Sequence, residues 1–93
     1  MVIASQTWEL SLPGCSSLKE KRTVVRSLKD RLSHKFNVSV AETAHQDVHA
    51  RAQITVALVG TDRRFVESVL DKVDHFVQEN ARAVILGVHR DLY

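Results

Sequence analysis

Positively charged side chains gather in one short stretch of this chain. Between Leu18 and Phe36 there are seven Lys or Arg against two acidic residues, whereas the rest of the chain holds six basic and nine acidic residues. At 100° per residue of helix, four of the seven lie within roughly 80° of one another. They are Lys19, Arg22, Arg26 and Lys29. Such a ridge could contact the phosphates of a nucleic acid. A solvated helix face, or a contact with an acidic helix of a second copy, would use the same residues.

A second candidate site lies immediately before this stretch. Free backbone N–H groups, Ser hydroxyls and a helix dipole would meet there, close to a Lys or Arg that could help to hold a phosphate or sulfate. The candidate anion-binding residues are Gly14, Ser16, Ser17 and Lys21. A purely structural explanation is also available, because Gly14 relieves a turn and Ser17 caps a helix. Lys21 falls inside the apolar arc of that helix, so it needs a snorkelling stem or a specific partner.

Candidate metal-binding and nucleophilic residues are few. His45, Asp47 and His49 alternate along the chain, so in a strand they would point one way, as metal ligands can. No dependable fourth ligand accompanies them, and we predict no metal. Cys15, the only cysteine, cannot form an intrachain disulfide and has no general base beside it in sequence. Because no catalytic motif is recognisable, we expect no enzymatic activity and no cofactor.

Length and composition are typical of one small globular domain. The chain has 93 residues, of which 44% are hydrophobic and 26% charged, so we expect a single domain over residues 1–93. No run approaches the ~18 consecutive apolar residues that a membrane span requires. Residues 1–12 alternate polar and apolar instead of forming an export signal. We therefore expect a cytoplasmic protein with no membrane contact.

The spacing of apolar residues predicts the elements that must position these sites. Period-2 alternation predicts strands over residues 2–12, 37–43, 51–59 and 82–91. Ser17 followed by Glu20 is a capping box that predicts a helix from Leu18, and Thr61 or Asp62 caps a second helix that ends near residue 80. The order βαββαβ predicts an α+β, ferredoxin-like sandwich, in which a four-stranded antiparallel sheet carries two helices on one face.

The other face of that sheet would be open. Alternation assigns small and moderately apolar residues to it: Ile3, Ser5, Thr7, Ser39, Ala41, Thr43, Thr55, Ala57, Val59, Ile85 and Gly87. In the last strand, Val84, Leu86 and Val88 would face the helices instead. Base stacking on the open face is disfavoured because no aromatic ring lies there. A flat, weakly polar surface of this kind could pack against a second copy, so a homodimer is one candidate assembly.

Four segments, in the same order along the chain, resemble the bacterial YlxP-like family of small uncharacterised proteins. They read LPGCSSLKEKR, FNVSVAE, HQD followed by RA, and DRR. The resemblance covers nearly the whole chain and implies a ferredoxin-like fold. It also implies a link to RNA or ribosomes, because family members are often encoded among translation and ribosome-maturation factors. It transfers no catalytic residue. Family members often have Trp in place of His49, which weakens the metal interpretation because an indole is not a ligand.

These observations predict a non-enzymatic RNA- or ribosome-associated module that binds phosphates through the four basic residues of the first helix. The alternative is a homo-oligomeric domain with a small-anion site at the N-terminus of that helix. A third class is suggested by acylphosphatases, which share the topology and hold phosphate in a loop before the first helix. That chemistry needs a loop arginine, and residues 13–18 contain none.

Overall fold

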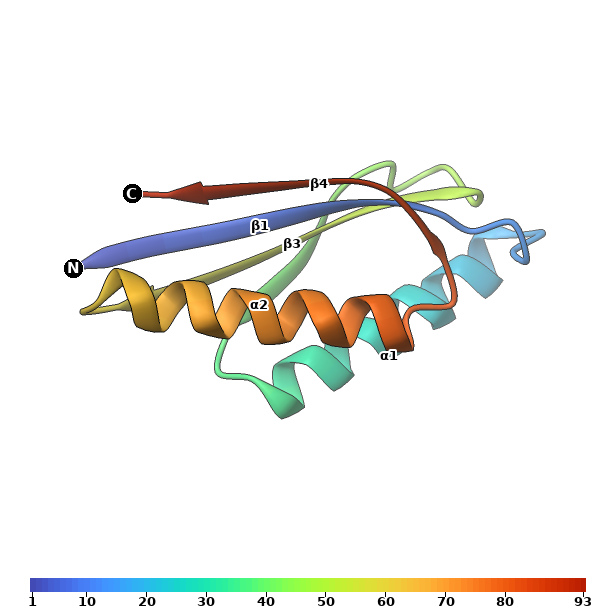
Figure 1. Ribbon diagram of the computed structural model, residues 1–93. Helices are drawn as coiled ribbons and strands as arrows, with labels where there is room; N and C mark the ends of the chain where they lie inside the picture. The colour runs from blue at the N-terminus through green and yellow to red at the C-terminus, as the bar shows by residue number, and fades with distance from the viewer.

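The fold pairs one antiparallel sheet with two helices, and the computed structural model describes all 93 residues. The elements are β1 (Val2–Ser11), α1 (Leu18–Lys35), β2 (Ser39–Ala44), β3 (Arg51–Gly60), α2 (Arg63–Asn80) and β4 (Val84–Leu92). The strand order is β2-β3-β1-β4, with all neighbours antiparallel. Both helices lie on the same face of this sheet (Figure 1). The predicted ferredoxin-like α+β fold is therefore confirmed. No helix is both long and apolar enough to cross a membrane.

Each helix begins at a polar residue that satisfies a free backbone N–H group. Ser17 Oγ accepts a hydrogen bond from the Glu20 backbone N–H at 3.2 Å, as the capping box predicts. Asp62 Oδ1 accepts from the Arg64 N–H at 3.0 Å and starts α2 in the same way. These local bonds explain why both helix starts could be read from the sequence.

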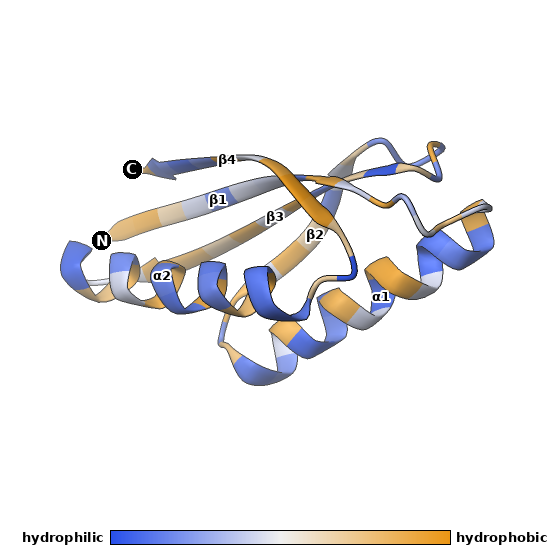
Figure 2. Ribbon diagram, turned by 45° about the vertical axis from the view of Figure 1, so that its right-hand side comes forward, coloured by the Kyte–Doolittle hydropathy of each residue, from blue (hydrophilic) through white to orange (hydrophobic).

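The core lies between the sheet and the helices and contains 15 buried apolar residues. Alternate residues of β1 and β3 supply one side, and residues three or four apart on each helix supply the other. Figure 2 shows the resulting recurrence of apolar residues along both helices. Trp8 is fully buried, and its indole N–H donates to Asp74 Oδ1 at 2.9 Å.

β4 departs from the predicted alternation. Leu10 pairs with Ile85 and Glu9 with Gly87, so Leu86 is an extra residue that forms a bulge. One extra residue reverses the alternation, so Val84 and Ile85, before the bulge, point to the opposite faces from those that an unbroken strand would give, whereas Gly87 stays opposite Glu9 on the open face. Ile85 therefore packs against the core, and its predicted place on the open face is wrong. Val84 and Leu86, predicted to face the helices, are 54% and 53% exposed.

Candidate functional site

The cationic ridge on α1 faces solvent. Lys19, Arg22 and Arg26 are exposed and Lys29 is half-buried. None of the four lies in an ion pair, although seven ion pairs form elsewhere in the chain. At 100° per residue, the ridge is roughly opposite the flank of α1 that faces α2. It therefore borders the side of the molecule where α1 covers the edge strand β2.

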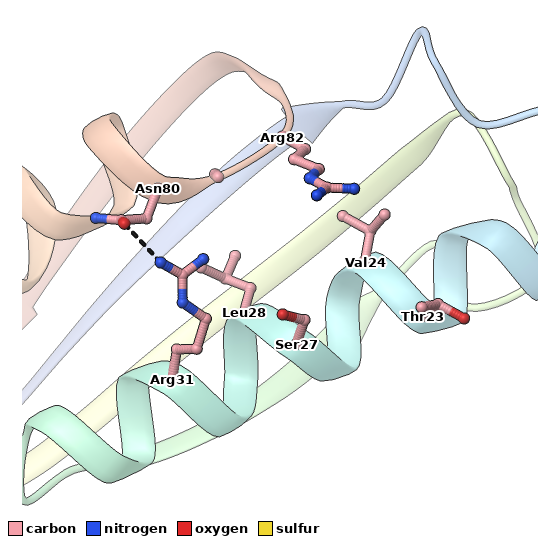
Figure 3. Close-up of a pocket in the computed structure, with 8 residues that line it drawn as sticks. Thr23, Val24, Ser27, Leu28, Arg31, Asn80 and Arg82 are labelled. Atoms are coloured by element: carbon pink, nitrogen blue, oxygen red, sulfur yellow. Dashed lines mark hydrogen bonds between the residues drawn. The ribbon is translucent and has the colours of Figure 1, made fainter.

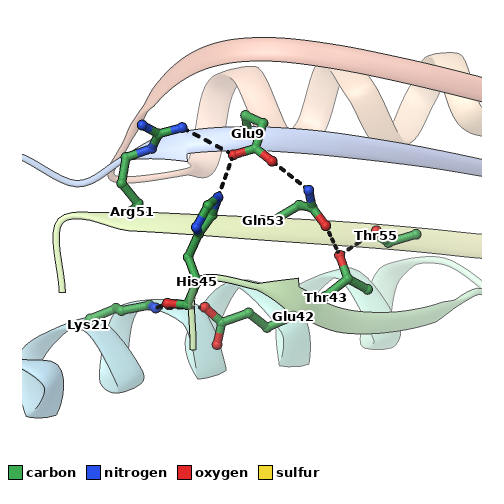
Figure 4. Close-up of polar contacts among 8 residues, drawn as sticks. All are labelled: Glu9, Lys21, Glu42, Thr43, His45, Arg51, Gln53 and Thr55. Carbon is green, nitrogen blue, oxygen red and sulfur yellow. Dashed lines mark hydrogen bonds and ion pairs between the residues drawn. The ribbon is translucent and has the colours of Figure 1, made fainter. Parts of the chain in front are cut away.

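Lys21 comes from the same basic run but does not join the ridge. Its side chain is fully buried, and its Nζ lies 2.8 Å from Glu42 Oε2 on β2 (Figure 4). The same ammonium donates a hydrogen bond to the backbone carbonyl of His45. Removing an ammonium from water costs several kcal/mol unless it is paired, so these contacts explain a lysine inside an apolar arc. The structure does not bring Lys21 together with the other three predicted anion-binding residues.

The Glu20 carboxylate occupies the turn where an external anion was predicted. The Ser16 backbone N–H donates to Glu20 Oε2 at 3.0 Å, and the Ser16 hydroxyl donates to Oε1 at 3.1 Å. These two bonds, the backbone one first, lower the pKa of Glu20 below its ordinary value. An anion bound at Gly14, Ser16 and Ser17 would have to displace this carboxylate. The anion site stays a prediction, because the Ser16 donors that would hold the anion already bond to the Glu20 carboxylate.

A polar network on the open sheet face was not predicted. The Glu9 carboxylate accepts hydrogen bonds from Gln53 Nε2 at 2.5 Å, His45 Nε2 at 3.1 Å and Arg51 Nη2 at 3.3 Å (Figure 4). The bond from Gln53 is the main cause of a lowered pKa at Glu9; burial opposes it, and His45 and Arg51 reinforce it. Thr43 extends the network, since its hydroxyl donates to Gln53 Oε1 at 2.6 Å.

The open face is therefore more strongly polar than expected. Glu9 and Gln53 occupy alternating positions that point to this face, so their side could be read from the sequence, but their pairing depends on the register of β1 against β3. A homodimer through this face stays a prediction, and it would have to cover a charged network.

His45 connects this network to the buried lysine. Its φ of 65° is a left-handed backbone conformation, which is uncommon for a residue other than Gly. The carbonyl meets Lys21 while the ring bonds to Glu9. No group of three or more His, Cys, Asp or Glu side chains is placed to hold a metal ion.

The fold and the ridge define a class: a small ferredoxin-like domain with an unpaired cationic helix face. Over residues 3–90 the chain belongs to the family described as Protein of unknown function (DUF503). It is similar to Uncharacterized protein YlxP of Bacillus subtilis (strain 168), with 39% identity over 69 residues, which is 74% of this chain and 75% of that protein. The predicted YlxP-like membership is confirmed. Neither description states an activity.

Proposed function

We propose that the chain is a non-enzymatic RNA- or ribosome-binding module whose cationic ridge contacts backbone phosphates. The observation that carries the proposal is the absence of carboxylate partners on the ridge. Some other cations of the chain do have them: Arg51 pairs with Glu9, and Arg90 pairs with Asp71 at 2.9 Å. Within the basic run itself, Glu20 accepts a hydrogen bond from the Ser16 backbone N–H, and Lys21 pairs with Glu42, so both residues already make contacts inside the fold. Other cations, such as Arg64 and Lys72, also lack a carboxylate partner, but the four ridge cations lie together on one face of a single helix and are available to a partner.

The spacing of the ridge suits a polyanion. Lys19 to Lys29 spans about 15 Å of helix, a distance over which a nucleic acid presents several phosphates. Arg22 and Arg26 are like charges one helical turn apart, an arrangement that costs a few tenths of a kcal/mol in isolation. Phosphates lying along the ridge would remove that repulsion. Contacts of this kind position a nucleic acid without reading its sequence.

The open sheet face is a poorer candidate for RNA. Glu9 and Asp91 place carboxylates on two of its strands, and carboxylates repel phosphates. The exposed rings on which RNA-recognition sheets stack bases have no counterpart among Thr7, Thr43 and Thr55. The helix ridge therefore supplies the better surface. The proposal implies a cytoplasmic location, in agreement with the translation-related gene context that the family resemblance implies.

A salt series with charge-neutralising variants tests the proposal. We expect the chain to co-sediment with ribosomal subunits or to bind single-stranded RNA, and Arg22→Gln/Arg26→Gln to weaken binding. On single-stranded RNA, losing two phosphate contacts should lower the slope of log K against log salt concentration by about 1.4. The matched control is Arg64→Gln/Lys72→Gln, which removes the same charge from exposed positions of α2.

Two results would contradict the proposal. One is a control variant that weakens binding as much as the ridge variant, because then only net charge matters. The other is an absence of RNA and ribosome binding by the unaltered chain at low salt.

A further inference from the structure

A separate hollow lies on the other flank of α1, where the helix faces the connection between α2 and β4 (Figure 3). Its volume is about 230 Å³, and its polar lining is Thr23, Ser27, Arg31, Asn80 and Arg82. A neighbouring hollow of about 540 Å³ shares Thr23, Val24 and Arg82 with it and extends towards Cys15. The larger hollow is also lined by Lys19 of the ridge and by Glu20, whereas the smaller hollow shares no residue with the ridge.

The smaller hollow is cationic. Arg31 and Arg82 line it, and no carboxylate does. Figure 3 shows the Arg82 side chain extending from its connection towards Val24, while Arg31 extends from α1 towards the end of α2. Arg82 is exposed and has no ion-pair partner. Two guanidinium groups without a counter-charge favour an anionic ligand.

Arg31 is held in place by a neutral group. Its Nη2 donates to Asn80 Oδ1 at 2.7 Å, and Asn80 Nδ2 donates to the Phe76 carbonyl at 2.9 Å. The guanidinium also lies 5.5 Å from the centre of the Phe76 ring. An amide orients the guanidinium without neutralising it, and four of its five N–H donors stay available. Because the Arg31 side chain is already ordered, binding an anion would cost less conformational entropy than binding to a freely rotating arginine.

We propose that this hollow binds a phosphomonoester, with the dianionic phosphate between Arg31 and Arg82. Guanidinium groups match phosphate oxygens in pairs of hydrogen bonds, and the Ser27 hydroxyl can add a further donor. The Thr23 hydroxyl is already used, because it donates to the Lys19 carbonyl at 3.1 Å. Val24, Leu28 and Ala81 supply apolar contacts for the organic part of the ester. This site is independent of the ridge and holds even if RNA binding by the ridge fails.

Titration of the full chain with adenosine monophosphate (AMP), followed by amide NMR and calorimetry, tests the site. We expect AMP to shift the amide signals of residues 23–31 and 80–82, and adenosine to leave them in place. Asn80→Asp sets a carboxylate against Arg31, so AMP affinity should fall by roughly tenfold or more. Arg82→Gln, at an exposed position, should weaken AMP to a similar degree. Arg64→Gln is the matched control and should bind AMP as the unaltered chain does.

The phosphomonoester could be a free nucleotide or the 5′ end of an RNA, and paired oligonucleotides distinguish these sources. If RNA ends are bound, a 5′-phosphorylated oligonucleotide binds more tightly than its 5′-hydroxyl form, and Asn80→Asp abolishes that difference. If small esters alone are bound, AMP binds and the two oligonucleotides do not differ. Arg22→Gln/Arg26→Gln should weaken both oligonucleotides equally and leave AMP unaffected, which separates this site from the ridge. The proposal is overturned if neither AMP nor the 5′-phosphate is preferred, or if Asn80→Asp and Arg82→Gln change nothing.

Discussion

Replacing Lys21 by Met should strongly destabilise the fold. Met preserves the length and apolar character of the stem, but it leaves Glu42, whose side chain is only 16% exposed, without its cation. Removing one partner of a buried ion pair costs about 3–5 kcal/mol. We expect a value of about 3 kcal/mol, because β2 is an edge strand and the Glu42 carboxylate can turn towards solvent. Domains of this kind have total stabilities of about 5–15 kcal/mol, so this is a large fraction.

A double-mutant cycle separates the charge from the packing. Lys21→Met/Glu42→Leu removes both charges, and replacing a buried pair by apolar groups is often nearly neutral. The double variant should therefore recover the part of the lost stability that comes from the unpaired Glu42 charge. The His45 carbonyl still loses its donor, which leaves a residual cost of about 1–3 kcal/mol. Urea unfolding followed by the fluorescence of Trp8, the single tryptophan, gives all four free energies of unfolding.

The matched control is Lys19→Met, an exposed lysine of the same helix without an ion pair, which should change stability by less than about 0.5 kcal/mol. A cost below about 1 kcal/mol for Lys21→Met would refute the reasoning, as would a zero coupling energy with Glu42→Leu. Either result would mean that the pair does not hold α1 to β2.

Two further predictions concern acid stability and capping. The pKa of Glu9 is lower in the folded chain than its ordinary value of 4.5, so its stabilising contribution is present above about pH 4.5 and is lost as the pH falls through the lowered pKa. Glu9→Gln should therefore be less stable than the unaltered chain at pH 7, and the two stabilities should converge in acid. Urea unfolding midpoints between pH 2 and 7 would measure this. A stability difference that stays constant over that pH range would contradict the prediction. Ser17→Ala removes the cap of α1 and should cost about 1 kcal/mol in thermal unfolding, whereas Ser33→Ala, exposed near the other end of the helix, should change little.

Several features of the fold were predictable because they depend on residues close together in the chain. Ser17 and Glu20 lie within one helical turn, so the start of α1 could be read directly. The inward faces of β1 and β3 follow from period-2 alternation, which is a property of each strand alone. The exposure of Arg22 and Arg26 follows in the same way from their angle to the apolar arc of α1.

Other features needed the tertiary structure. The sequence showed that Lys21 was misplaced on an apolar face, but only the packing of α1 over β2 supplied Glu42 and the His45 carbonyl. The bulge at Leu86 exists only relative to β1, so alternation within β4 could not reveal it.

By itself, therefore, the sequence determined the elements, their apolar faces and the concentration of positive charge on one helix. Only the tertiary structure decided which charges are used inside the fold and which are left free, and it alone assembled Arg31, Asn80 and Arg82 around one hollow. The physical reason is that periodicity specifies the direction of a side chain, whereas its partner depends on strand register and helix packing between distant segments.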